Sequence, residues 1–368
     1  MRLFRLALVG SVAILPLLVL PTVVGALVDY AGLTESQAGW AAAASGAGSA
    51  LAAILIALRI RHLDRRKLAI VGLAVLFTFD LLSALVGSIP MWLFIVIRGI
   101  AGIGGAAAYA AVMASYAEMD NSERGYGLFM VLQFAISAIG LYWLPYILPT
   151  IGISGLYVCL AAIVMLAFTQ VGTVPGRPDV DSPEALEIRT ILAPAAILAM
   201  LGIGLFETAN NMHFTYAERI GVGFEIGHER VGAILGIVTV IGMFAAYAVF
   251  LIGDRFGELK PILACLAVAI VALLCLDQFS GEALYFATMT ALSVAWAFGL
   301  PYFQAFEARL DPGGSVVVAG GLFTAAGGAL GPALAATAVA PGNYSAVLLL
   351  AAGIYVITAL IMTVASRL

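Results

Sequence analysis

The chain has 368 residues, of which 63% are hydrophobic and only 10% are charged, and its formal net charge is -4. About a quarter of the residues in soluble globular domains are charged, so this composition excludes an ordinary soluble protein and indicates one that crosses a membrane many times. The small net charge gives no reason to expect a nucleic-acid partner.

Hydrophobic runs between polar breaks predict the membrane-spanning helices, because about 20 apolar residues are needed to cross the hydrocarbon. The first run starts at about Arg5 and has no small-residue cleavage site at the usual distance, which predicts an uncleaved helix rather than a signal peptide. The short breaks predict a compact bundle without an extra soluble domain. The twelve predicted spans are 5–28, 38–58, 68–88, 91–116, 126–148, 153–172, 191–217, 229–252, 261–277, 283–305, 316–339 and 345–365.

The fourth span contains one arginine, Arg98, followed by the small residues Gly102, Gly104 and Ala106. An arginine at membrane depth costs about 2.5–3.5 kcal/mol on insertion scales, so it usually faces a partner or a watery cavity. The small residues allow neighbouring helices to approach backbone to backbone. Asp80 in the third span has a similar predicted depth, roughly 11–12 Å below the outer surface at about 1.5 Å per residue. We therefore expect an Asp80–Arg98 pair, which is either static or rearranges during function.

The longest break, 173–190, carries three prolines, which stop a helix from running through it. We predict that it is a cytoplasmic linker between an N-terminal six-helix bundle, 1–172, and a C-terminal six-helix bundle, 191–368. Within it, Ser182 to Glu184 has the cap and first-turn proline of a short helix that leads into the seventh span.

The two halves resemble each other at a nearly constant offset. Gly39 matches Gly232 and Lys67 matches Lys260 at an offset of 193 residues, and a Gly-Leu-Phe triplet recurs at 194. A shared offset that falls on corresponding helices predicts duplicated halves, a common plan among transporters.

The distribution of basic residues predicts the orientation of the spans. The N-terminus, the breaks after even-numbered spans and the C-terminus together hold 14 of the 17 Lys and Arg residues. The opposite breaks hold only Arg219 and Arg230, and Arg98 lies within a span. Because cytoplasmic loops carry the excess of positive charge, both termini are predicted to be cytoplasmic.

Two motifs resemble those of the major facilitator superfamily. Arg98 and its glycines resemble the motif of that family's fourth helix, although Ala101 stands where the family usually has glutamine. The loop Asp254-Arg255-Phe256-Gly257 keeps much of the family's loop signature, whereas the loop after the second span keeps only Arg65-Arg66-Lys67, with Asp64 at a glycine position. The resemblance covers nearly the whole chain. It implies an all-α membrane protein with twelve transmembrane helices in two pseudo-symmetric six-helix bundles, whose helices 1, 4, 7 and 10 line a central cavity.

The seventh span carries Glu207, Asn210 and Asn211 on one helical face. A carboxylate and two amides at membrane depth indicate a solute or proton site, and the alternative is that they hydrogen-bond to neighbouring helices. We favour the site because three such groups exceed what packing requires. His213 is predicted to lie nearer the outer surface and to be hydrogen-bonded or solvated.

The tenth span offers further candidates for the cavity. Trp296 is equally consistent with stacking on a substrate and with ordinary packing, and Tyr302 and Gln304 follow it. Glu307, at the cytoplasmic end of the span, is expected to belong to a gate. Tyr109 in the fourth span is a further candidate for the substrate site.

These features predict a secondary transporter that moves a small organic solute by alternating access, coupled to protons. Glu207 is expected to carry the proton, Arg98 to sense its charge state across the cavity, and Asp80 to hold Arg98 in place. An exporter of amphipathic compounds or drugs is the alternative within this class, although the Gly-Pro motif of many drug–proton antiporters is absent from 126–148. A non-transporting receptor or a membrane-embedded enzyme is the alternative from another class. The three scattered histidines form no catalytic cluster, so no enzyme is expected.

No cofactor or metal is predicted. Cys159, Cys265 and Cys275 all lie in apolar runs without metal-ligand spacing. The expected partners are the solute, protons and the lipid bilayer. We expect a monomer in the inner (plasma) membrane of a bacterium.

Overall fold

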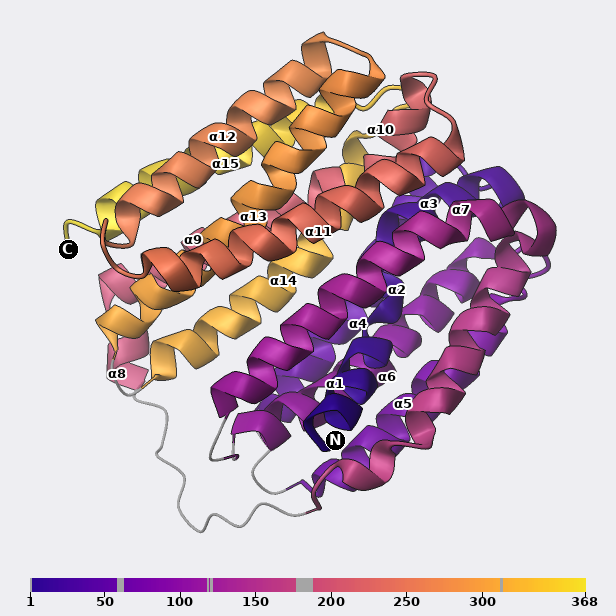
Figure 1. The fold of residues 1–368 in the computed structure, drawn as a ribbon, viewed down its shortest axis with the longest axis horizontal. Coiled ribbons are helices and arrows are strands. Elements are labelled where there is room, and N and C mark those ends of the chain that lie inside the picture. The colour runs from indigo at the N-terminus through magenta and orange to yellow at the C-terminus, as the bar shows by residue number, and fades with distance from the viewer. Residues whose placement is uncertain (1, 58–62, 118, 120–121, 177–187, 312–313) are drawn as a thin grey trace. The chain divides into compact units, whose positions relative to one another are not determined.

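The computed structural model describes all residues except 1, 58–62, 118, 120–121, 177–187 and 312–313 (Figure 1). The chain divides into two compact units, Met1–Pro183 and Glu184–Leu368, called here the N-terminal and C-terminal units. Apart from a bridge between Ala340 and Asn343, the regular structure of the described residues is helical.

The helices of the two units follow the predicted spans closely. The N-terminal unit contains α1 (Arg2–Ala13), α2 (Leu15–Leu18), α3 (Leu20–Ala31), α4 (Glu35–Ala57), α5 (Arg65–Ser83), α6 (Met91–Ala117), α7 (Ser122–Phe168) and the short 3₁₀ helix η1 (Val171–Thr173). The C-terminal unit contains α8 (Ile188–Ile191), α9 (Pro194–Thr215), α10 (Ala217–Gly223), α11 (His228–Ile252), α12 (Leu259–Gln278), α13 (Glu282–Leu310), α14 (Ser315–Ala338) and α15 (Ser345–Ala365).

Nine of the described helices are long and apolar enough to cross a membrane. The other three of the twelve predicted crossings are not counted as separate helices of this kind, for the following reasons. α7 combines two crossings, since its backbone leaves helical geometry at Gly152, where φ is 62°. Glycine adopts this left-handed conformation without steric penalty. α5 carries three basic residues in its first turn and Asp80 near its end, which reduces its apolar character. The first crossing is divided among α1, α2 and α3.

The division of the first crossing corrects the prediction of a single helix over 5–28. The backbone leaves helical geometry at Ile14 and Val19, where φ is -113° in both cases. Pro16 and Pro21 follow these breaks and occupy the first turns of α2 and α3, where a missing N–H does not matter. The sequence did not predict these two breaks, because the apolar run is continuous and hydropathy does not indicate where a helix is interrupted. In Figure 1 the three helices follow one another upward from the N-terminus.

Backbone-to-backbone packing through glycines organises the N-terminal unit around α6, as predicted from its small residues. A Cβ on Gly102 would collide with the carbonyl of Ser45 in α4, and one on Gly104 with the carbonyl of Gly72 in α5. Likewise, a Cβ on Gly105 would come within 2.5 Å of the Ala13 carbonyl oxygen in α1. α6 is therefore held on three sides at a spacing that only glycine allows.

The same pairs of crossings pack together in both units. In the N-terminal unit α6 packs on α4 and α5, and α5 packs on α7. In the C-terminal unit α13 packs on α11 and α12, and α12 packs on α15. The repeated sequence offset therefore has a counterpart in repeated packing.

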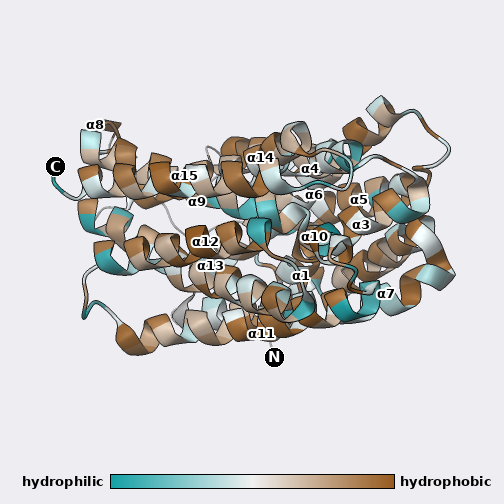
Figure 2. Ribbon diagram, turned by 90° about the horizontal axis from the view of Figure 1, so that it is seen from above, coloured by the Kyte–Doolittle hydropathy of each residue, from teal (hydrophilic) through white to brown (hydrophobic). Residues whose placement is uncertain are grey.

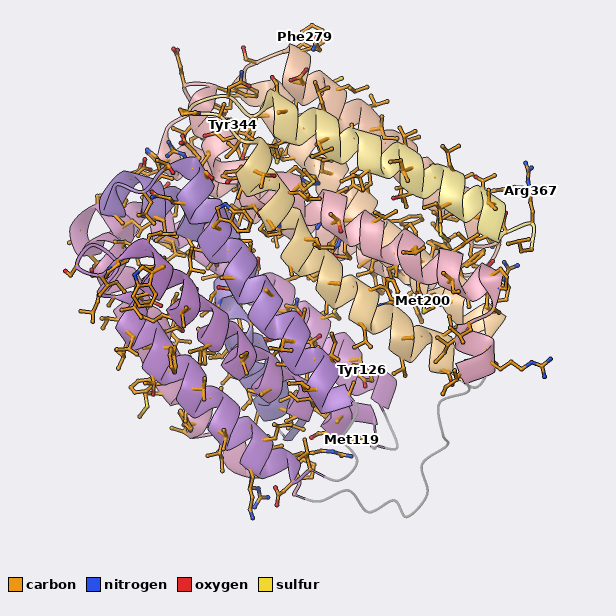
Figure 3. The ribbon with its side chains drawn as sticks, turned by 180° about the vertical axis from the view of Figure 1, so that it is seen from behind. Met119, Tyr126, Met200, Phe279, Tyr344 and Arg367 are labelled. Carbon is orange, nitrogen blue, oxygen red and sulfur yellow. The ribbon has the colours of Figure 1, made fainter. Side chains whose placement is uncertain are left out.

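The outer surface of the bundle is suited to lipid. In Figure 2, α12 and α15 are hydrophobic along most of their length, with hydrophilic residues near the helix ends. Large apolar side chains are exposed; Phe250 on α11, for example, is 79% exposed. Phe279, after α12, and Tyr344, before α15, lie at one end of the C-terminal unit, and Arg367 lies at the other (Figure 3). Such a surface fits a membrane and would be unfavourable in water.

The loop that resembles the family's signature also has a local structural role. Asp64 caps α5, since its Oδ1 accepts a hydrogen bond from the Lys67 backbone N–H at 3.0 Å. The Arg66 Nε donates to the carbonyl of Val174 at 2.9 Å, which ties the start of the predicted linker to α5. The proposed cap at Ser182 to Glu184 lies outside the described residues.

Candidate functional site

A buried carboxylate on α9 is the centre of the candidate site in the C-terminal unit. Glu207 is 6% exposed. Its Oε1 accepts a hydrogen bond from the Trp296 Nε1–H of α13 at 2.9 Å, and its Oε2 accepts one from the Asn211 Nδ2–H at 3.2 Å. Within the described part of the chain, no cation lies within ion-pair distance of Glu207. The carboxylate is thus held by neutral donors alone, which stabilise its charge far less than a cation would.

Two glycines of α14 bring that helix against the face of α9 that carries Glu207. A Cβ on Gly327 would lie 2.7 Å from the Cβ of Glu207 and 2.5 Å from the Gly204 carbonyl oxygen. One turn later, a Cβ on Gly331 would lie 2.6 Å from the Cβ of Asn211. The close approach leaves the Glu207 and Asn211 side chains little freedom, so their hydrogen bond is preorganised.

The structure brings together two of the three polar residues predicted to share a face of α9. Asn211 also donates from Nδ2 to the Glu207 backbone carbonyl at 2.8 Å, so it bonds within its own helix. Asn210 is half-buried, and its amide makes no hydrogen bond to the residues that the structure describes. Asn210 is therefore the member of the set whose hydrogen-bonding capacity is unused.

The second candidate pair, Asp80 and Arg98, forms a buried ion pair in the N-terminal unit. Arg98 Nη1 lies 2.7 Å from Asp80 Oδ1 and also donates to Ser83 Oγ at 3.1 Å. Asp80 is fully buried and Arg98 is 4% exposed. The guanidinium lies over the ring of Tyr157, 5.1 Å from its centroid. The equal depth of Asp80 and Arg98 predicted the pair, but Tyr157 gave no signal because it lies within an ordinary apolar run.

The remaining predicted residues do not join either cluster. Tyr109 packs its ring against Phe129, with centroids 5.8 Å apart. Tyr302 is buried, and its hydroxyl donates to the Gly253 carbonyl at 2.9 Å, at the end of α11. Gln304 is exposed. Tyr109 and Tyr302 therefore have structural contacts that would exist without a substrate.

His213 and Glu307, which the sequence analysis singled out in the C-terminal unit, are also buried. His213 is 4% exposed, and its Nε2 is 3.5 Å from the Tyr355 hydroxyl, so it is not the solvated histidine that one alternative foresaw. Glu307 is 1% exposed and its carboxylate lies against Gly320 of α14. Its Oε1 has no hydrogen-bond partner among the described residues.

Comparisons with known proteins place the fold. The family model described as Major Facilitator Superfamily matches residues 6–325. A mutant of the nucleoside transporter NupG superposes with a TM-score of 0.82 at 13% identity, covering 99% of this chain and 100% of that one. A D-xylose-proton symporter gives 0.77 at 16% identity, covering 98% and 96%. A bacterial homologue of the human lysosomal transporter Spinster gives 0.70 at 13% identity, covering 100% and 95%. No curated protein matches the chain.

Proposed function

Since the chain belongs to the major facilitator superfamily, whose members are secondary transporters rather than enzymes, we propose that it moves a small organic solute by alternating access in a proton-coupled cycle. The structures named for a nucleoside and for D-xylose share the fold of this chain. At 13% and 16% sequence identity, they do not indicate which substrate this chain binds. The argument for proton coupling rests on Glu207 in the C-terminal unit and on Asp80 and Arg98 in the N-terminal unit.

The observation that carries the proposal is the buried Glu207 carboxylate, which has no cationic partner among the described residues. Transfer of an ionised carboxylate away from water is unfavourable unless a partner compensates its charge. Trp296 and Asn211 each provide one neutral N–H, so both the ionised and the protonated forms can be accommodated. A side chain that can exist in both forms inside a transporter is suited to carry a proton.

Asp80 and Arg98 are assigned a different role, because each already has an oppositely charged partner. The 2.7 Å contact and the bond to Ser83 hold the guanidinium in one position. We assign Asp80 to hold Arg98, and Arg98 to respond to the charge state of Glu207 during the cycle. Asn210, whose amide is unused, is assigned to contact the solute. Trp296, Tyr109, Tyr302 and Gln304 are retained as weaker candidates for substrate contact.

The orientation is also proposed. With both termini in the cytoplasm, 14 of the 17 basic residues face it, as the positive-inside rule requires. We place the chain, as a monomer, in the plasma membrane of a bacterium.

The experiment begins by identifying the solute. A stability-shift screen of purified protein against a broad solute library finds compounds that bind the folded state, because such binding raises the apparent stability. Uptake and counterflow are then measured in proteoliposomes with an imposed pH gradient. Glu207→Gln should abolish gradient-driven accumulation and retain counterflow, since a permanently neutral side chain permits the conformational change. Full gradient-driven accumulation by this variant would contradict the assignment of Glu207.

A further inference from the structure

The N-terminal unit contains a small cavity, open on one side, next to the Asp80–Arg98 pair. Its volume is about 30 Å³. A single water needs about 10–15 Å³ on this measure, so the cavity holds two waters or a group of similar size, such as a carboxylate. Arg98 is the one charged side chain among the described residues that line it. Asp80, on the other side of the guanidinium, is not part of the lining.

Arg98 has donors to spare for a ligand. Both of its hydrogen bonds, to Asp80 and to Ser83, start from the same atom, Nη1. The Nε–Nη2 edge therefore has no partner among the described residues. A guanidinium presents five N–H donors in a planar fork, and this edge matches the two oxygens of a carboxylate. An anion at this edge would gain charge-assisted hydrogen bonds, which are roughly twice as strong as neutral ones.

The broken first crossing forms another wall of the cavity. Pro16 and Leu17 of α2 line it, and so does Leu20, the first residue of α3. The positive end of the α3 dipole is therefore at the cavity, and so is the negative end of α1, since Ala13 lines it as well, so the helix ends alone select no charge. Transporters commonly build substrate sites from interrupted helices whose N-terminal ends point at anionic groups of the substrate. The interrupted crossing thus lies at the cavity, and the Arg98 edge is the feature that favours an anion there.

Most of the remaining lining is apolar. Val23, Val24 and Leu27 contribute it from α3, and small residues contribute it from α4 and α6. Two of the three hydroxyls in the lining are already engaged, because Ser45 donates to the Ala41 carbonyl at 3.2 Å and Ser49 donates to the Gly102 carbonyl at 3.1 Å. The third, of Tyr157, has no hydrogen-bond partner among the described residues and is available to a ligand. A polyhydroxylated solute would find few partners here, and a cation would be repelled by Arg98.

We propose that the transported solute is an organic monocarboxylate, whose carboxylate binds the Nε–Nη2 edge of Arg98 and whose apolar body lies against α3. This inference rests on the proposed function, since it names the substrate class of that transporter. Asp80 neutralises Arg98, so the ligand is held by directed hydrogen bonds rather than by net charge. The carboxylate and the coupled proton together carry no net charge, so their joint movement is electroneutral.

The test compares benzoate with benzamide, which has the same ring and a similar shape but no charge. Binding to purified wild-type protein is measured by isothermal titration calorimetry. Benzoate should bind about tenfold or more tightly than benzamide, because hydrogen bonds to an ionised acceptor are roughly twice as strong as neutral ones. Arg98→Lys keeps the charge and loses the planar fork, so it should weaken benzoate binding about tenfold. Arg230→Gln, which removes an exposed arginine paired with Glu282, is the matched control and should leave binding unchanged.

Equal affinity for benzoate and benzamide in the wild-type protein would overturn the proposal without any variant. Unchanged benzoate binding by folded Arg98→Lys would overturn the assignment to Arg98, and acetate competing as well as benzoate would overturn the apolar part of the site. The proposed function fails by a separate result, namely benzoate binding and exchange that do not respond to a pH gradient. Proton-driven uptake of a neutral solute, with no carboxylate binding, would refute only the substrate class.

Discussion

Removing Arg98 should be far more damaging than removing both members of its ion pair. In Arg98→Met, Asp80 keeps its position at 0% exposure and loses the cation that contacted it at 2.7 Å. Breaking a buried pair in this way typically reduces the free energy of unfolding by about 3–5 kcal/mol, because a buried charge is left uncompensated. In the double variant Asp80→Leu with Arg98→Met, no charge remains, and replacement of a buried pair by apolar residues is often neutral or stabilising, by about 1–4 kcal/mol.

The assay is reversible unfolding in mixed micelles titrated with sodium dodecyl sulfate, followed by circular dichroism. Wild type, the two single variants and the double variant form a double-mutant cycle, whose coupling energy isolates the interaction between the two side chains. We expect each single variant to be much less stable than the double variant, while the double variant loses transport. Single variants as stable as wild type would refute the reasoning, since they would show that neither charge depends on the other for its burial.

The remaining predictions concern packing, solute contact and orientation. Gly327→Ala should lower the free energy of unfolding by about 1–3 kcal/mol, because its Cβ meets Glu207 and the α9 backbone, whereas Gly328→Ala, with nothing within 4 Å, should not destabilise; equal effects of both would contradict the packing argument. Asn210→Ala should weaken binding of the identified solute about tenfold without changing thermal stability, and wild-type affinity in titration calorimetry would place the solute elsewhere. A cysteine at Ser182, in a chain without native cysteines, should not react from outside intact cells with an impermeant thiol reagent, and labelling there would refute the orientation. The positions that should react are Ser36, Ser280 and Ser345.

The sequence was most informative where physical rules act locally along one helix. The faces and depths of Glu207, Asn211, Asp80 and Arg98 follow from 3.6 residues per turn and 1.5 Å per residue, and the structure brings these residues together in pairs. The close packing of α6 followed from its small residues for the same reason. The helical fold could also be predicted, because within a membrane the backbone N–H and C=O groups of each apolar segment must be hydrogen-bonded inside a helix.

What could not be predicted depends on contacts between segments far apart in the chain. Trp296 lies 89 positions from Glu207, and nothing in its own helix indicates whether its indole faces a substrate or a carboxylate. The contact of Tyr157 with Arg98 could not be predicted either, since an aromatic residue in an apolar run is ordinary. The hydroxyl of Tyr302 is another case, because its partner is a backbone carbonyl that carries no sequence signature.

The glycine contacts of α6 have a mechanical consequence for the transport cycle. A helix whose backbone touches the backbones of α1, α4 and α5 cannot slide or rotate against them without steric overlap, so these four helices must move as one rigid lever. α2 differs, since it is four residues long and has a non-helical residue at each end. We therefore expect bending within the N-terminal unit to occur at Ile14 and Val19, the two non-helical residues beside the cavity.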